Sequence, residues 1–125
     1  MAKTKVSFGD VREIGLALPD VEEGTAYGSP ALKVRGKLLA CVAIHKSAEP
    51  DSLAVMMDMD QRAGVLADAP QTYYVTDHYV SHPVVLVRLA RIRREELRDL
   101  LSSSWRFVTA QKSVKSANRK PRKSR

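Results

Sequence analysis

The chain has 125 residues, which suits one domain and excludes two of ordinary size. With 44% apolar and 28% charged residues, its composition is that of a globular protein, and no apolar run approaches the roughly 20 residues of a membrane span. One cysteine excludes an internal disulfide, and no apolar stretch follows Lys3 and Lys5, so the sequence predicts a cytoplasmic protein without a signal peptide.

The net charge of +7 is concentrated at one end of the chain. Residues 1–111 hold 14 basic and 14 acidic side chains, whereas residues 112–125 hold seven basic and no acidic ones. We therefore predict a single domain over 1–111 and a disordered basic arm over 112–125. Such arms bind polyanions, most often nucleic acid; the alternative is a solubilising tail. The seven bases of the arm are Lys112, Lys115, Arg119, Lys120, Arg122, Lys123 and Arg125.

Three helices are predicted from caps and apolar spacing. The first begins after Ser7, with Asp10 completing a capping box, and ends at Pro19. Asp60 is expected to cap a short helix over residues 61–67. A last helix over residues 93–111 has one apolar face, which should place Trp105 on a sheet. That face consists of Leu97, Leu100, Leu101, Ser104, Trp105 and Val108.

Between these helices the sequence reads as strands joined by short turns. Residues 20–27 are expected to form a loop or the entry to a first strand, and a tight turn at Arg35-Gly36 predicts a hairpin. The apolar run 38–44 predicts a central strand that is buried on both faces. The fold class expected is α+β, with an antiparallel sheet of about five strands and the terminal helices packed on it in two layers. The strands predicted are 31–35, 37–45, 52–57, 73–76 and 84–89.

Several motifs resemble the MmcQ/YjbR family. The stretches 18–25 and 27–37 resemble the family's opening, and His78-Tyr79 followed by residues 83–87 resembles its later strands. Glu96-Leu97 with Ser104-Trp105 is similar to its last helix. The resemblance covers roughly residues 8–112 and implies a compact α+β domain, often described as a double wing and labelled DNA-binding. Residues 79–83 depart from the family, whose closer members tend to have Lys and Trp between the last two strands.

Three arginines form the main candidate site within the predicted domain. Arg91, Arg94 and Arg98 lie at the start of the last predicted helix and should fall along one flank of it. Cations beside the free N–H groups of a helix start suit an anion such as a phosphate. The alternative is a solvated helix face, with Glu95 and Glu96 offsetting the helix dipole.

The sequence predicts no metal, no cofactor and no catalytic site. His78 and His82 have zinc-like spacing, but they fall in a loop without two further ligands. Cys41 and His45 on one strand would lie about 13 Å apart, too far for a nucleophile and its base.

The best functional prediction is a non-enzymatic nucleic-acid-binding module. The neutral balance of residues 1–111 argues against strong binding by the folded part, so the arm should carry most of the affinity. Two alternatives remain open: a module that docks a protein partner on its sheet, and a small-molecule binder with a cleft near Tyr27, Lys33 and Tyr79. A monomer is favoured, and no membrane partner is expected.

Overall fold

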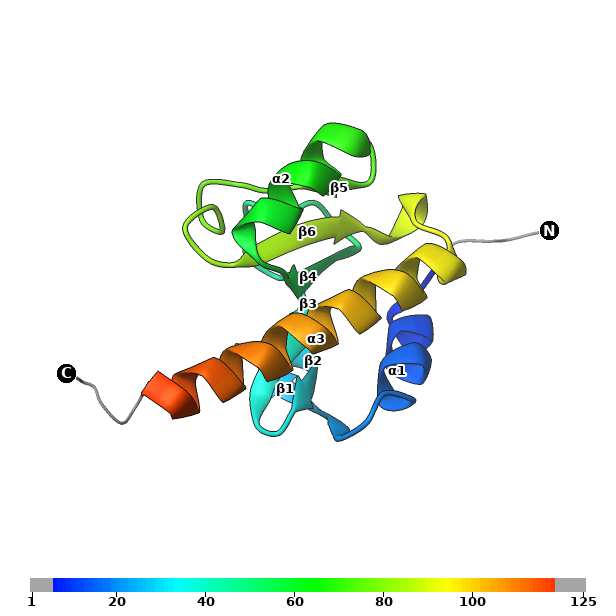
Figure 1. The fold of residues 1–125 in the computed structure, drawn as a ribbon. Coiled ribbons are helices and arrows are strands. Elements are labelled where there is room, and N and C mark those ends of the chain that lie inside the picture. The colour runs from blue at the N-terminus through cyan, green and yellow to red at the C-terminus, as the bar shows by residue number, and fades with distance from the viewer. Residues whose placement is uncertain (1–5, 119–125) are drawn as a thin grey trace.

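A six-stranded antiparallel sheet forms the centre of the molecule (Figure 1). The computed structural model describes residues 6–118, and side chains for residues 6–110. The strand order is β1-β2-β3-β4-β6-β5, which confirms the predicted α+β class. The strand beyond the five predicted is β1, which lies in residues 20–27, where the sequence predicted either a loop or the entry to a strand. The strands are β1 (Val21–Ala26), β2 (Ser29–Val34), β3 (Lys37–Val42), β4 (Ser52–Met56), β5 (Tyr73–Tyr74) and β6 (Val84–Arg88).

Two-residue turns join the first three strands. Arg35 and Gly36 have φ of 52° and 82°, and Tyr27 and Gly28 have φ of 55° and 80°. Two consecutive left-handed residues match the twist of a hairpin, so the predicted turn at Arg35-Gly36 is confirmed.

The central strand is shorter than the apolar run that predicts it. β3 ends at Val42, and the Ile44 side chain is 58% exposed, so burial of the whole run 38–44 is wrong. A register shift opposite Leu32 and Lys33 makes Leu39 an extra residue in β3. Leu39 and Ala40 therefore both belong to the core beneath the helices, while Cys41 packs on the opposite face.

The first two helices begin at a hydroxyl cap and an acidic cap. In α1 (Phe8–Leu16), Asp10 accepts a hydrogen bond from the Ser7 backbone N–H at 3.0 Å, which confirms the capping box. In α2 (Met59–Asp68) the cap is Asp58, not Asp60, because β4 ends at Met56 and the helix starts two residues earlier than predicted. Its carboxylate accepts from the Gln61 N–H at 2.9 Å.

The last helix, α3 (Arg94–Asn118), extends beyond its predicted end at residue 111. Residues 94–118 contain neither Pro nor Gly, the residues that commonly mark a helix C-terminus. No helix in the described chain is both long and apolar enough to cross a membrane.

All three helices cover the same face of the sheet (Figure 1). Leu97 and Leu101 of α3 are fully buried there against strand residues such as Leu32 and Leu53. Trp105 lies at the margin of this core, where its indole N–H donates to the Pro19 carbonyl at 2.8 Å. It therefore stabilises the link between α1 and β1 rather than the centre of the sheet.

The capping box makes stability depend on pH. The hydrogen bond from the Ser7 N–H, followed by the charge of Arg94, lowers the pKa of Asp10 below its usual 3.8. The Asp10 carboxylate therefore stabilises the fold fully at pH values above its usual pKa. This stabilisation is lost as the pH falls through the lower pKa of the folded state. Thermal melts should show a smaller loss of stability below about pH 4 for Asp10→Asn than for the parent chain. Identical curves for Asp10→Asn and the parent would contradict this assignment.

Candidate functional site

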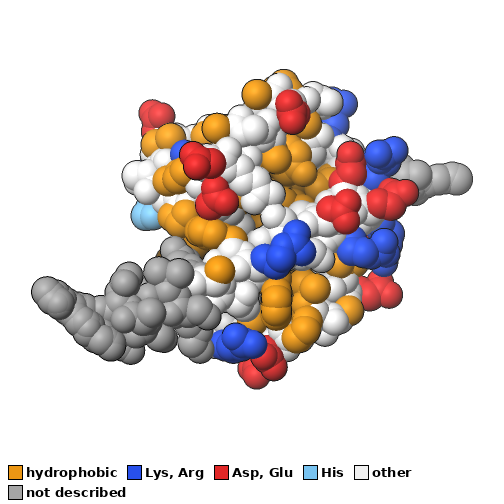
Figure 2. All heavy atoms as spheres, viewed as in Figure 1, with side chains coloured by type: hydrophobic (Ala, Val, Ile, Leu, Met, Phe, Trp, Pro, Cys, Tyr) orange, Lys and Arg blue, Asp and Glu red, His pale blue; other side chains and the backbone are white. Residues whose placement is uncertain are grey.

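The predicted arginine flank does not form as a unit. Arg91 lies in the short 3-10 turn Leu89–Arg91, and the extended residue Ile92 separates it from α3. Arg94 pairs with Asp10 and Glu13 of α1. Figure 2 shows basic and acidic side chains interspersed over this side of the molecule. The positive charge of Arg94 is thus offset by partners from another helix, which a local reading of the sequence cannot find.

The predicted basic arm lies largely beyond the described part of the chain. Lys112 and Lys115 fall on the last turns of α3, where the backbone alone is described. The other five bases, Arg119, Lys120, Arg122, Lys123 and Arg125, lie outside the described residues.

An apolar groove of about 740 Å³ lies on the sheet face opposite the helices. Its floor is formed by strand residues that include Leu38, Cys41, Ala54 and Met56. Tyr27, which is 84% exposed, lines it from the β1–β2 turn. We name this hollow the sheet groove.

The sheet groove exists because the sheet is apolar on both faces but has helices on one. Along β4, Leu53 and Val55 face the helices, while Ala54 and Met56 face the groove. Along β6, Val85 and Val87 face the helices, while Val84 and Leu86 face the groove. Three residues on this face have small side chains, so they leave a hollow between the sheet and the flanking loops. They are Ala31, Cys41 and Ala54. The unbroken apolar runs of both strands signal two buried faces, but the sequence does not show which face lacks a helix.

All three histidines of the chain line this groove. His45 and His78 stack with ring centres 3.5 Å apart and planes 7° apart, and Tyr79 meets both rings edge-on. His82 lies further along the loop. Sequence reasoning paired His78 with His82, whereas the structure pairs His78 with His45, 33 positions earlier in the chain.

The tautomer of His45 follows from its contacts. The Ser47 backbone N–H donates to Nδ1 of His45 at 3.0 Å, so Nδ1 is an acceptor and the neutral ring carries its proton on Nε2. Burial lowers the pKa of His45, and the nearby charges of His78 and Lys46 lower it further. Both effects favour the neutral ring, with its Nε2–H available as a donor.

Cys41 on the groove floor is a free, buried thiol. Burial raises its pKa, so it stays protonated and unreactive compared with an exposed cysteine. Burial likewise raises the pKa of Tyr79, although a hydrogen bond with the His45 backbone opposes that shift. Within residues 6–110, no three His, Cys, Asp or Glu side chains converge as ligands for a metal ion.

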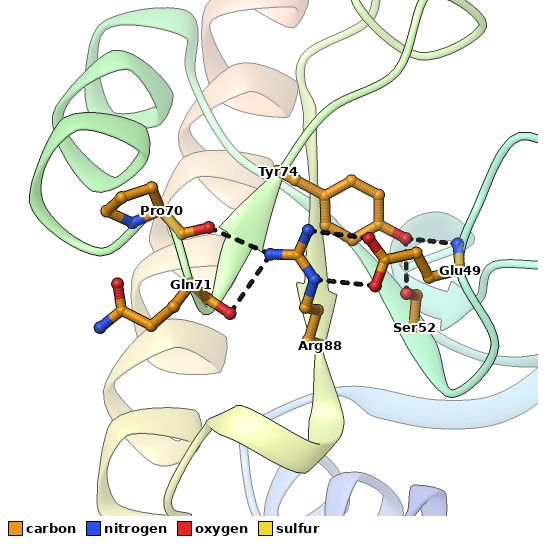
Figure 3. A network of polar contacts seen from close by, with 6 residues as sticks. All are labelled: Glu49, Ser52, Pro70, Gln71, Tyr74 and Arg88. Carbon is orange, nitrogen blue, oxygen red and sulfur yellow. Dashed lines mark hydrogen bonds and ion pairs between the residues drawn. The ribbon is translucent and has the colours of Figure 1, made fainter.

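One wall of the groove is secured by Arg88 (Figure 3). Its guanidinium donates to both carboxylate oxygens of Glu49 at 2.8 Å, and lies 4.4 Å from the centre of the Tyr74 ring. The Tyr74 hydroxyl in turn bonds Ser52 and the Glu49 N–H. This network ties the β3–β4 connection, which carries His45, to the far edge of the sheet. The Arg88 guanidinium also donates hydrogen bonds to the backbone carbonyls of Pro70 and Gln71.

The adjoining β5–β6 loop is secured by Arg62 of α2. Its guanidinium donates to the backbone carbonyls of Val80, His82 and Val84 at 2.9–3.2 Å. These bonds fix the β5–β6 loop that carries His78 and Tyr79, so both walls are preformed.

Comparison with known proteins places the domain in a family. A family model described as YjbR matches residues 16–107, which is most of the chain. The chain belongs to the YjbR family. Its fold is similar to the crystal structure of Deinococcus radiodurans protein DR2400, with a TM-score of 0.68, 22% identity, and coverage of 87% of this chain and 83% of that one. This likeness confirms the YjbR-like fold that the motifs suggested.

Relatives of this YjbR-family domain include two mycobacterial proteins described as uncharacterized. Rv2570 of Mycobacterium tuberculosis and Mb2600 of Mycobacterium bovis are each 38% identical over 48 residues. The match spans 38% of this chain and 37% of each relative's length. Of the cleft residues predicted for this YjbR-family domain, Tyr27 and Tyr79 line the groove, whereas Lys33 lies outside it.

Proposed function

We propose that this YjbR-family domain is a non-enzymatic binding module that contacts nucleic acid through its basic C-terminal segment, residues 112–125. The observation that carries the proposal is the segregation of charge: the seven bases of that segment account for the whole net charge of +7. The end of α3 extends past the strands on the side away from α1 (Figure 1).

The folded part should add little to this affinity. Arg93 and Arg94 both pair with carboxylates, which weakens their attraction for phosphate. Arg91 and Arg98 are exposed and can add individual contacts. Binding of this kind is electrostatic and carries little sequence preference, because phosphate contacts hold no base information.

The test is a salt titration of binding by the full chain. Each phosphate contact on duplex DNA contributes about 0.9 to the slope of log affinity against log salt. Engagement of half to all of the seven bases gives a slope between about −3 and −6. Fluorescence anisotropy with two labelled duplexes of unrelated sequence should show this slope and similar affinities between about 50 and 200 mM salt. No binding at the lowest salt would contradict the proposal.

A further inference from the structure

We propose that the sheet groove binds a small organic carboxylate, with its hydrocarbon body on the apolar floor and its carboxylate against the His45–His78 pair. The site lies on the folded body, and the proposal does not rest on nucleic-acid binding. It follows from three features: the composition of the floor, the unpaired donors at the rim, and the fixed walls.

The floor suits a hydrocarbon body. Leu38, Cys41, Ala54 and Met56 offer apolar surface, and about 740 Å³ lies within the usual range for small-molecule sites. Water on such a floor gains few hydrogen bonds, so its displacement by hydrocarbon is favourable.

The polar groups of the groove favour a ligand head that only accepts hydrogen bonds. Among the residues whose side chains are described, the lining holds no Asp, Glu, Lys or Arg. In the described part of the chain, neither Nε2–H of His45 nor either ring nitrogen of His78 has a hydrogen-bond partner. Every imidazole has at least one N–H, so the stacked pair presents at least two donors. A carboxylate accepts both, and the adjacent Lys46 adds a favourable charge, whereas an ammonium head would find no anionic partner.

The walls favour a small molecule over a protein partner. Arg88 holds the segment before β4, and Arg62 holds the loop before β6, so both segments that carry the histidine pair are fixed before any ligand arrives. A preformed, bounded hollow binds a small ligand without the ordering cost of a moving loop.

Decanoate is the probe, with decan-1-ol and decylammonium as controls of equal chain length. Calorimetry on the full chain should show saturable one-to-one binding of decanoate, about tenfold weaker binding of the alcohol, and none of decylammonium. Equal binding of decanoate and decylammonium would refute the carboxylate assignment. Absence of decanoate binding would refute the site.

Two kinds of variant test the placement. The double variant His45→Phe/His78→Phe keeps two flat rings but removes both donors, and should weaken decanoate about tenfold without affecting the alcohol. Lys33→Gln, at a residue outside the groove, is the control and should bind decanoate like the parent. If the double variant and the parent bind decanoate with equal affinity, the carboxylate head is held by other residues.

Cys41 supplies a second readout because it is the one cysteine in the chain and forms part of the floor. Saturating decanoate should slow the alkylation of Cys41 by iodoacetamide in both the parent and Lys33→Gln. An unchanged alkylation rate at saturating decanoate would show that the hydrocarbon tail of decanoate binds outside the groove, and would overturn the proposal. Measurement of melting temperatures shows that each variant is folded.

Discussion

Replacement of all seven bases in residues 112–125 with glutamine is expected to abolish measurable binding to duplex DNA at about 100 mM salt and to reduce the magnitude of the salt slope to about 2 or less. Glutamine retains good helix propensity, so the variant preserves the end of α3, which truncation after residue 111 would remove. Loss of three to seven phosphate contacts corresponds to a decrease in affinity of at least about a hundredfold. Anisotropy titrations of the variant and parent measure this difference.

The control for that experiment lies on the folded body. Arg91→Gln/Arg98→Gln removes two exposed charges that were predicted to bind phosphate, and should reduce the slope by at most about 2. A larger loss in the control than in the arm variant would place the binding surface on the body. Thermal melts of both variants should match the parent, because none of the substituted residues belongs to the described core.

Gly15→Ala is expected to destabilise the domain by about 1–3 kcal/mol, although Gly→Ala within a helix normally stabilises. A Cβ at residue 15 would lie 2.3 Å from Cδ1 of Leu32 and 4.0 Å from Cδ1 of Leu101. Leu32 is fully buried between α1 and the sheet, so its side chain has no free space into which it can move. The gain in helix propensity is about 1 kcal/mol and is smaller than the cost of repacking.

The matched control is Gly64→Ala in α2, where nothing lies within 4 Å of the added Cβ. It should stabilise by about 0.5–1 kcal/mol, the ordinary propensity effect. Urea denaturation of both variants gives the two free energies of unfolding. If both substitutions stabilise, α1 does not approach β2 as closely as described.

Local sequence signals predicted the parts of the fold that local physics determines. Ser7 and Asp10 are three residues apart and cap the same turn, and Arg35-Gly36 forms a turn from two adjacent residues. The apolar face of α3 follows from helical spacing alone. Between Asp58 and Asp60 the choice of cap depended on where β4 ends, which is a property of the sheet.

The candidate site was less predictable because its contacts join distant segments. His45 and His78 meet because the β3–β4 connection and the β5–β6 loop come together over the same face of the sheet, and no spacing in the sequence indicates it. The ion pair between Arg94 and Asp10 spans 84 positions. Ile44 looked like the end of a buried strand because hydropathy does not distinguish a groove rim from a core.

The place of α3 in the core has a consequence for biosynthesis. Leu97 and Leu101 complete the core over β2, β3 and β4, so every strand leaves the ribosome before the helix that covers it. Until α3 is made, the sheet exposes Leu32, Leu53 and their neighbours, and such surfaces bind chaperones or aggregate. We therefore expect nascent chains arrested before residue 94 to be protease-sensitive and chaperone-bound, with protection arising only after residues 94–108 have emerged.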